Sequence, residues 1–191
     1  MKLTLIRHGM TEGNRRSLYY GRTELPLLPE GIAELEAQRE QGGYPQAKRY
    51  YTSGMLRTEQ TFQILYGTLP HEALYGLREI DFGDFEMKTY EELKDDPQFQ
   101  QWLHGDMEVN VCPNGESSAQ VTVRAKQALA AVLAAGEDTV CVVHGGVIAN
   151  LMNDWFPKTK HRYAWTPKLG HGYQIEFQNG RPVSYCTVPI E

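Results

Sequence analysis

The segment Lys2-Leu-Thr-Leu-Ile-Arg7-His8-Gly9 has the pattern of a short apolar strand that runs into a glycine-containing turn. A second segment, Thr139-Val-Cys-Val-Val143, has the composition of a strand buried on both faces, and His144-Gly145-Gly146 follows it. Strands of this kind are typical of parallel sheets that helices cover on both sides. Each strand therefore brings one histidine to the carboxyl edge of a sheet, where ligands gather in α/β folds.

The segments around these strands predict a three-layer α/β/α sandwich with a mainly parallel sheet. Helical periodicity is expected over residues 31–41, 55–66, 90–104 with a break near Pro97, and 118–135 with an end at Gly136. Residues 49–52 form a weaker strand candidate. Two further strands, 173–177 and 183–188, flank Asn179-Gly180, a strong hairpin signal, and predict a C-terminal antiparallel hairpin.

Length and composition limit the class of protein. The 191 residues show no repeat or linker and predict one domain over residues 1–191. With 19 Lys and Arg against 24 Asp and Glu, the net charge is −5, which disfavours binding of nucleic acid through its phosphates. The longest apolar run, 128–135, is too short to cross a membrane, and the N-terminus lacks a signal-peptide pattern. Three cysteines without a C-x-x-C pair predict reduced thiols. We expect a cytoplasmic protein without membrane or nucleic-acid partners; its oligomeric state is left open.

Chemistry-bearing residues occur where the predicted strands end. Arg7-His8-Gly9 combines a fixed cation, an imidazole and a flexible turn, with Asn14 shortly after. Arg57 is expected in the first turn of a helix, where backbone N–H groups also favour an anion. Glu79 and Asp81 alternate with apolar neighbours, an environment that can keep a carboxyl group protonated. The pattern predicts an anion site with an acid beside it.

Six blocks in this order resemble the histidine phosphatase superfamily, in its phosphoglycerate mutase-like branch, which includes small enzymes such as α-ribazole phosphatases. The blocks are Arg7-His8-Gly9 with Asn14, residues 21–27 with Gly31, Ser53 to Arg57 with Gln60-Thr61, Glu79 to Glu86, Pro113 to Ser117, and His144-Gly145-Gly146. The sequence departs from the family at Met87, where glycine is usual, at Leu28-Pro29, where Leu-Thr is common, and at Tyr20, where relatives often carry glutamine or another small polar residue. We expect Met87 to reshape the substrate wall and Pro29 to be tolerated at a first helical position.

The resemblance implies a catalytic group made of His8, Glu79, His144, Arg7 and Arg57. His8 is the expected nucleophile, which forms a phosphohistidine, and Glu79 the expected proton donor, with Asp81 and Asp84 as alternatives. Arg7, Arg57 and a cationic His144 are expected to bind the phosphate without a metal or cofactor. Arginines beside His8 should lower its pKa, and a backbone carbonyl on its second ring nitrogen would fix the tautomer. Further phosphate or substrate contacts are expected at Asn14, Tyr20, Gly21 and Gly145.

The expected activity is hydrolysis of a phosphomonoester of a small metabolite, such as an α-ribazole phosphate-like compound or a sugar phosphate. A phosphoglycerate mutase is the first alternative, although such mutases are generally longer and shield the phosphoenzyme with inserted segments. A non-catalytic phosphate-binding relative is the second. We call residues 85–112 the cap segment and expect it to lie over the pocket; its side chains Phe85, Tyr90, Phe99, Trp102 and Met107 favour an apolar or planar leaving group.

Overall fold

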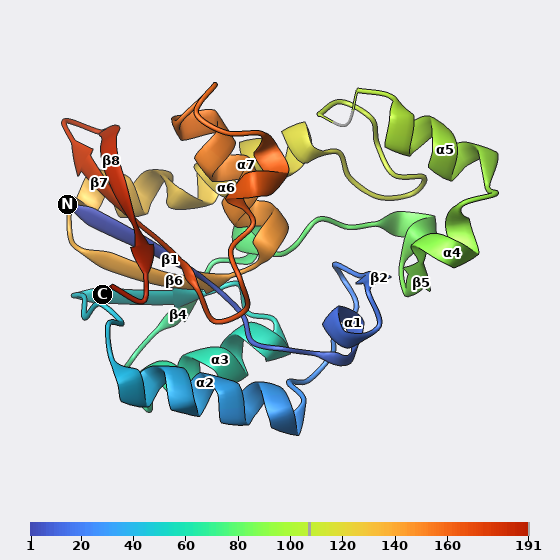
Figure 1. The fold of residues 1–191 in the computed structure, drawn as a ribbon. Coiled ribbons are helices and arrows are strands. Elements are labelled where there is room, and N and C mark those ends of the chain that lie inside the picture. The colour runs from blue at the N-terminus through green and yellow to red at the C-terminus, as the bar shows by residue number, and fades with distance from the viewer. Residues whose placement is uncertain (107, 191) are drawn as a thin grey trace.

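A six-stranded sheet in the order β4-β3-β6-β1-β7-β8 forms the centre of the protein (Figure 1). The structure is a computed structural model and describes residues 1–106 and 108–190. The pairs β1–β6, β3–β6 and β3–β4 are parallel, whereas β1–β7 and β7–β8 are antiparallel. The strands are β1 (Lys2–Arg7), β3 (Arg49–Thr52), β4 (Glu72–Ala73), β6 (Thr139–Val143), β7 (Gly172–Gln178) and β8 (Arg181–Val188). The mainly parallel sheet and its C-terminal hairpin confirm the prediction.

Helices cover both faces of this sheet (Figure 1). On one face lie α2 (Pro29–Gln41) and α3 (Leu56–Tyr66), and on the other lie α6 (Ser118–Ala135) and α7 (Gly145–Trp155). Alternate residues of β1 point to opposite faces, so Leu5 packs into the core under α6 and α7, while Ile6 packs with Phe62 of α3. The three-layer arrangement predicted from the sequence is therefore confirmed.

Local signals explain where the helices begin and end. Ser117 caps α6 in a capping box, and Gly136 ends it with a φ of 67°. Pro29 opens α2, a position at which its missing N–H costs nothing. The helix predicted over 90–104 is split into α4 (Tyr90–Leu93) and α5 (Pro97–His104), as Pro97 indicated. The helix α7 was not expected from the sequence, because the two glycines at its start, Gly145 and Gly146, have low helix propensity.

The cap segment forms a separate group of elements at one side of the sheet (Figure 1). Its strand β5 (Lys88–Thr89) pairs with β2 (Leu18–Tyr19), and α4 and α5 follow. It has its own core of Phe85, Leu93, Phe99, Trp102 and Cys112. Met107, which we expected to join these side chains, lies outside the described residues. Short elements complete the fold: α1 (Glu12–Arg15) and the 3-10 turns η1 (Tyr75–Leu77), η2 (Gly83–Phe85) and η3 (Arg162–Trp165). None of the helices described is long and apolar enough to span a bilayer.

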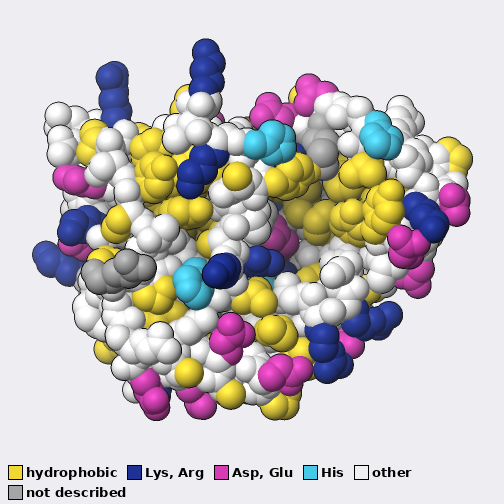
Figure 2. All heavy atoms as spheres, in the orientation of Figure 1, with side chains coloured by type: hydrophobic (Ala, Val, Ile, Leu, Met, Phe, Trp, Pro, Cys, Tyr) yellow, Lys and Arg dark blue, Asp and Glu magenta, His cyan; other side chains and the backbone are white. Residues whose placement is uncertain are grey.

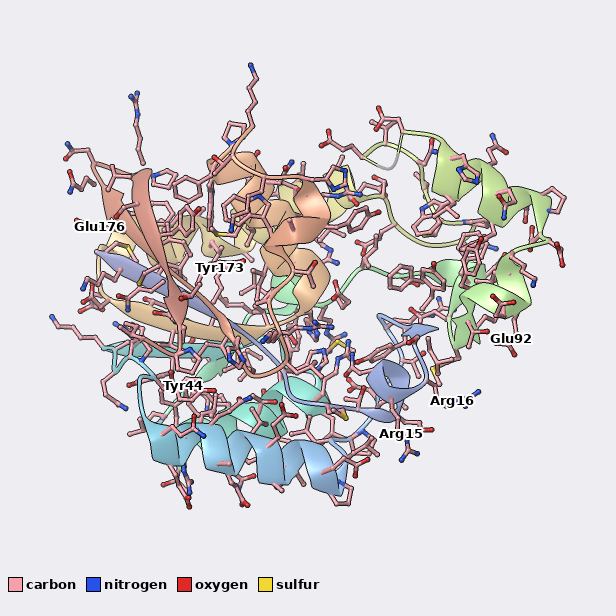
Figure 3. The ribbon with its side chains drawn as sticks, viewed as in Figure 1. Arg15, Arg16, Tyr44, Glu92, Tyr173 and Glu176 are labelled. Carbon is pink, nitrogen blue, oxygen red and sulfur yellow. The ribbon has the colours of Figure 1, made fainter. Side chains whose placement is uncertain are left out.

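Charge links the cap segment to the start of the chain. Arg15 and Arg16 extend from the end of α1 on the side where Glu92 of α4 also lies (Figure 3). Hydrogen bonds from the backbone and hydroxyl of Thr89 lower the pKa of Glu92, and Arg16 and Lys88 add to this effect. The cap segment is thus joined to the first 20 residues by a β-ladder and by complementary charge.

Candidate active site

His8 follows β1 directly and is almost completely buried, with 3% of its surface exposed. Its Nδ1 lies 2.7 Å from the carbonyl oxygen of Gly9, which fixes Nδ1 as the protonated nitrogen and leaves the Nε2 lone pair free. Burial, followed by the charges of Arg57 and Arg7, holds the pKa of His8 well below its ordinary value. His8 is therefore neutral at physiological pH, with a nucleophilic Nε2.

His144 follows β6, the strand next to β1, and its ring centroid lies 5.3 Å from that of His8. Its Nδ1 accepts a hydrogen bond from Arg57 Nε at 3.2 Å, so its proton is on Nε2, which lies 2.8 Å from Ser53 Oγ. Burial, Arg57 and His8 hold the pKa of His144 well below its ordinary value. A buried ring that accepts from an arginine is disfavoured as a cation, so His144 is neutral in these contacts. A cationic His144 on a bound phosphate stays a prediction.

Two arginines supply the fixed positive charge: Arg57 is buried and Arg7 is partly buried. Arg57, the second residue of α3, is fully buried and donates to the carbonyl oxygens of Gly21 at 2.8 Å and Thr23 at 3.0 Å as well as to His144. Arg7 donates to the carbonyl oxygen of Pro167 at 2.8 Å, but its buried Nε makes no hydrogen bond to any residue that the structure describes. A buried, unpaired guanidinium N–H is costly unless a ligand accepts from it. Arg7 therefore presents an open donor to an anion.

Gly145 explains how Arg7 fits against the start of α7. A Cβ at Gly145 would lie 3.0 Å from Arg7 Nε and 3.2 Å from its Cζ, closer than nearly all real Cβ contacts. The glycine lets the guanidinium lie directly on the helix backbone. Gly145 therefore lies beside the predicted phosphate site and supports the Arg7 guanidinium there.

Asn14 and Tyr20 form one hydrogen-bonded group with Thr11. The Oδ1 of Asn14 accepts from the Thr11 backbone N–H at 3.0 Å and from the Tyr20 hydroxyl at 2.9 Å, and that hydroxyl also lies 2.7 Å from Thr11 Oγ1. The Tyr20 ring lies under the Arg57 guanidinium, 5.0 Å from Cζ. Because the oxygen of Asn14 is engaged, its amide nitrogen is the group left to meet an anion. Tyr20 supports this arrangement through its ring and hydroxyl.

Gly21 was expected to contact the phosphate or the substrate, but its backbone groups are engaged within the protein. Its N–H donates to Glu86 Oε1 at 2.7 Å and its carbonyl accepts from Arg57, so both backbone groups have partners inside the protein. Glu86 also accepts from the Arg22 N–H at 3.1 Å and the Thr23 hydroxyl at 2.6 Å. The geometry makes Gly21 a support of Arg57 and makes Glu86 the anchor of that support. Sequence reasoning assigned no role to Glu86, although it lies within one of the matched blocks.

Glu79 lies where α7 begins. Its Oε2 accepts from the Gly146 N–H at 3.0 Å and its Oε1 from the Ile80 N–H at 2.9 Å. Its charge acts on Arg7 and Arg57, which places it in the same site. The alternatives are engaged in turns: Asp81 Oδ1 accepts from the Gly83 N–H at 2.8 Å, and Asp84 Oδ2 accepts from Asn114 at 3.0 Å. Of the three carboxylates, Glu79 is the one whose charge acts on both Arg7 and Arg57.

The chain around Glu79 is held by a salt bridge that the sequence analysis missed. Arg124 of α6 donates from Nε and Nη2 to the two oxygens of Glu116, each at 2.8 Å. The same guanidinium donates to the carbonyl oxygens of Gly76 at 2.8 Å and Glu79 at 3.0 Å. Arg124 therefore fixes the backbone from which Glu79 extends.

A cavity of about 330 Å³ opens beside Glu79, since both of its hydrogen-bond donors, Ile80 and Gly146, line it. Figure 2 shows hydrophobic side chains gathered in a hollow between the cap segment and the rest of the molecule. The cavity is lined by Tyr19, Ile80, Phe82, Trp102, Leu103, Ser118, Gly146, Ala149, Asn150, Arg162, Tyr163 and Thr166. Met87 lies outside this lining and has a φ of 62°. The site thus joins a cationic centre to a largely aromatic pocket.

Comparison with known proteins places this geometry in a family. The family model of the histidine phosphatase superfamily (branch 1) matches residues 3–185. The adenosylcobalamin/alpha-ribazole phosphatase of Salmonella typhimurium is 30% identical over 158 residues, which are 80% of this chain and 78% of that protein. The fold resembles the alpha-ribazole phosphatase of Shigella flexneri, with a TM-score of 0.82, 23% identity and coverage of 95% and 93% of the two chains.

A phosphoglycerate mutase of Thermus thermophilus is also similar in structure. Its TM-score is 0.75 and its identity 26%, over 97% of this chain and 98% of that one. Phosphatases and mutases therefore both occur among the similar proteins. The match over nearly the whole sequence, together with the two strand-end histidines and the arginines beside them, shows that this chain belongs to the histidine phosphatase superfamily.

Proposed function

We propose that the protein is a metal-independent phosphomonoesterase that works through a phosphohistidine on His8. The observation that carries this proposal is the 2.7 Å contact between His8 Nδ1 and the Gly9 carbonyl, which leaves Nε2 unprotonated at the centre of the site. A module that only bound phosphate would need the arginines but not a nucleophile with an acid beside it. Cytoplasmic location is part of the proposal and is supported by three free cysteines.

In the first step, Nε2 of His8 attacks phosphorus, and the bond from phosphorus to the leaving oxygen breaks. Arg7 and Arg57 stabilise the charge spread over the three remaining phosphoryl oxygens. Glu79 gives its proton to the leaving oxygen, so the product departs as an alcohol. His144 Nδ1 accepts from Arg57 Nε and holds that side chain in place. When a bound dianion accepts the Arg57 N–H instead, Nδ1 can take a proton, and the resulting cation stabilises the charge of the phosphate.

In the second step, water attacks the phosphohistidine. Glu79, now a carboxylate, takes a proton from this water as its oxygen bonds to phosphorus and the P–N bond breaks. Inorganic phosphate leaves, and His8 returns to its neutral form. Each step is easier than direct attack of water on the ester.

The aromatic cavity supports a leaving group with a planar or apolar part. Tyr19, Phe82 and Trp102 form edge-to-face contacts with one another and present ring surfaces to the cavity. A substrate resembling α-ribazole phosphate, which has a ring system attached to a sugar phosphate, fits this wall, and small sugar phosphates remain an alternative class. The name of the Salmonella relative is consistent with the first class.

Labelling of the phosphoenzyme tests the mechanism. Brief mixing with a ³²P-labelled phosphomonoester followed by denaturation should give acid-labile label on the native chain and none on His8→Ala, whose turnover should fall below about 1%. Retained activity in His8→Ala would contradict the nucleophile assignment. Activity should be unaffected by EDTA, because Arg7 and Arg57 provide the charge that a metal would provide.

The fate of the phosphoryl group separates hydrolysis from mutase activity. A phosphatase releases inorganic phosphate at a rate independent of 2,3-bisphosphoglycerate. A mutase interconverts 2- and 3-phosphoglycerate, requires the bisphosphate and releases phosphate slowly. Isomerisation faster than phosphate release by the purified protein would overturn the phosphatase assignment and leave the role of His8 intact.

A further inference from the structure

The cavity beside Glu79 contains one unusual side chain. Aromatic and aliphatic groups make up most of its wall, and Arg162 is the one charged residue that lines it within the described part of the chain. Arg162 begins η3, the short turn that follows α7. Within the described residues, a pocket with an otherwise uncharged lining therefore contains a single fixed positive charge, separate from Arg7 and Arg57, which do not line it.

The hydrogen bonding of Arg162 is incomplete. Among the described residues, buried Nη1 has no hydrogen-bond partner, and Nη2 donates only to the Tyr163 hydroxyl, at a long 3.3 Å. The guanidinium lies over the ring of Tyr163, 5.1 Å from its centroid. Glu108 and Asp154 line an adjoining hollow with Arg162, yet no carboxylate of the described residues lies within 4.0 Å of its nitrogens. A buried guanidinium N–H without an acceptor is costly, and a ligand oxygen would remove that cost.

We propose that Arg162 is a specificity-determining residue that binds an anionic oxygen on the leaving group, so that the preferred substrates are phosphomonoesters whose ring-bearing part carries a second acid, a carboxylate or phosphate. This inference rests on the proposed phosphatase function. The substrate spans the site: its reacting phosphoryl group lies between Arg7 and Arg57, its planar part against Trp102, and its acid at Arg162.

Neighbouring groups fit such a ligand. Ser118 at the start of α6 and Asn150 of α7 also line the cavity, and each has a side chain that can donate a hydrogen bond to an oxygen. The low-polarity wall strengthens a charge-assisted bond to Arg162, because water is displaced from around it. The same wall penalises an acid that Arg162 does not meet, so charge contributes selectivity as well as affinity.

Paired aryl phosphates test the proposal directly. The substrates are 3- and 4-carboxyphenyl phosphate, their neutral carbamoyl counterparts and phenyl phosphate. The native protein should prefer at least one carboxyl compound over its carbamoyl partner by about tenfold or more in kcat/KM. Arg162→Gln should abolish this preference, and Arg162→Lys should retain part of it. Arg181→Gln, an exposed arginine on β8, is the matched control and should keep the native preference.

The outcomes separate the two proposals. If none of these five aryl phosphates is hydrolysed, the phosphatase function itself fails. If some are hydrolysed but no carboxyl preference exists, or the preference survives in Arg162→Gln, the assignment of Arg162 is wrong and the phosphatase stands. An equal loss by Arg162→Gln on charged and neutral substrates would also overturn the assignment, because it would place the effect on the fold or the phosphate site.

Discussion

The carboxylate of Glu79 accepts a hydrogen bond from the backbone N–H of Gly146, 3.0 Å away, at the first turn of α7. A side chain at residue 146 would collide with it, since a Cβ there would lie 2.5 Å from Glu79 Oε1. The start of the helix that follows His144 directly therefore holds the Glu79 carboxylate as well. In the proposed mechanism, this relationship connects the phosphate with the leaving oxygen.

We expect Glu79→Gln to lower kcat for a poor leaving group by about 10² to 10⁴-fold. The loss should be much smaller for 4-nitrophenyl phosphate, because nitrophenolate departs without a proton. Steady-state rates on an alkyl phosphate and on the nitrophenyl ester give the comparison. Equal losses on both would show that Glu79 positions the phosphate, and the acid would then be sought at Asp81 or Asp84.

Removal of the Arg124 side chain should displace the backbone of Glu79 while the Glu79 side chain itself is unaltered. Arg124→Met deletes the pair with Glu116 and the bond to the Glu79 carbonyl, so we expect a loss of about 1 to 3 kcal/mol in unfolding free energy. The rate ratio between alkyl and nitrophenyl esters should shift in the direction of Glu79→Gln. Denaturant melts and the two-substrate assay measure these effects. Lower stability with an unchanged rate ratio would restrict Arg124 to a role in the fold.

Stability should depend on pH through His8 and His144. Both have a lowered pKa in the folded state, so below the ordinary value of about 6.5 the unfolded chain binds more protons than the folded one. Their contribution is complete above about pH 6.5 and is lost as the pH falls, by about 1.4 kcal/mol per unit for each ring. Unfolding free energies between pH 7.5 and 5 measure the slope. His8→Asn should make it shallower, and an unchanged slope would contradict the buried neutral state of His8.

At Met87, glycine and alanine variants should show the reverse of their usual order of stability. Its φ of 62° is a left-handed conformation that costs a residue with a Cβ about 1 to 2 kcal/mol, and glycine avoids this cost. Met87→Gly should therefore be more stable than Met87→Ala, by about 1 kcal/mol, although alanine is the more stable residue at ordinary positions. Thermal melts of the two variants decide the point. A more stable alanine variant would show that the backbone relaxes at this residue.

The sequence predicted the elements that carry strong local signals. The apolar strands before His8 and His144, the Asn179-Gly180 hairpin and the break at Pro97 depend on residues that are neighbours in the chain. The α7 helix was not predicted because the two glycines at its start have low helix propensity. In the folded protein, tertiary packing of the apolar face of α7 outweighs this low propensity.

The same distinction applies to the site. Arg7, His8, Arg57, Glu79 and His144 could be named in advance, and the structure brings them together. Glu86 and Arg124 could not, because their partners are backbone groups of distant residues and leave no mark on the local sequence. The lowered pKa of His144 could not be predicted from the sequence, because burial, which only the complete fold sets, is its main cause.

The position of β6 between β3 and β1 has a consequence for how activity arises during folding. β1 and β3 are synthesised before β6, yet β6 must pair with both of them before the sheet is continuous. The hydrogen bond from the His8 N–H to the Val143 carbonyl also forms only when β6 is in place. Such contacts between distant parts of a chain form slowly. A nascent chain that lacks residues 139–144 therefore lacks part of the proposed phosphate site, and we expect the onset of turnover in a refolding experiment to report the closing of the sheet.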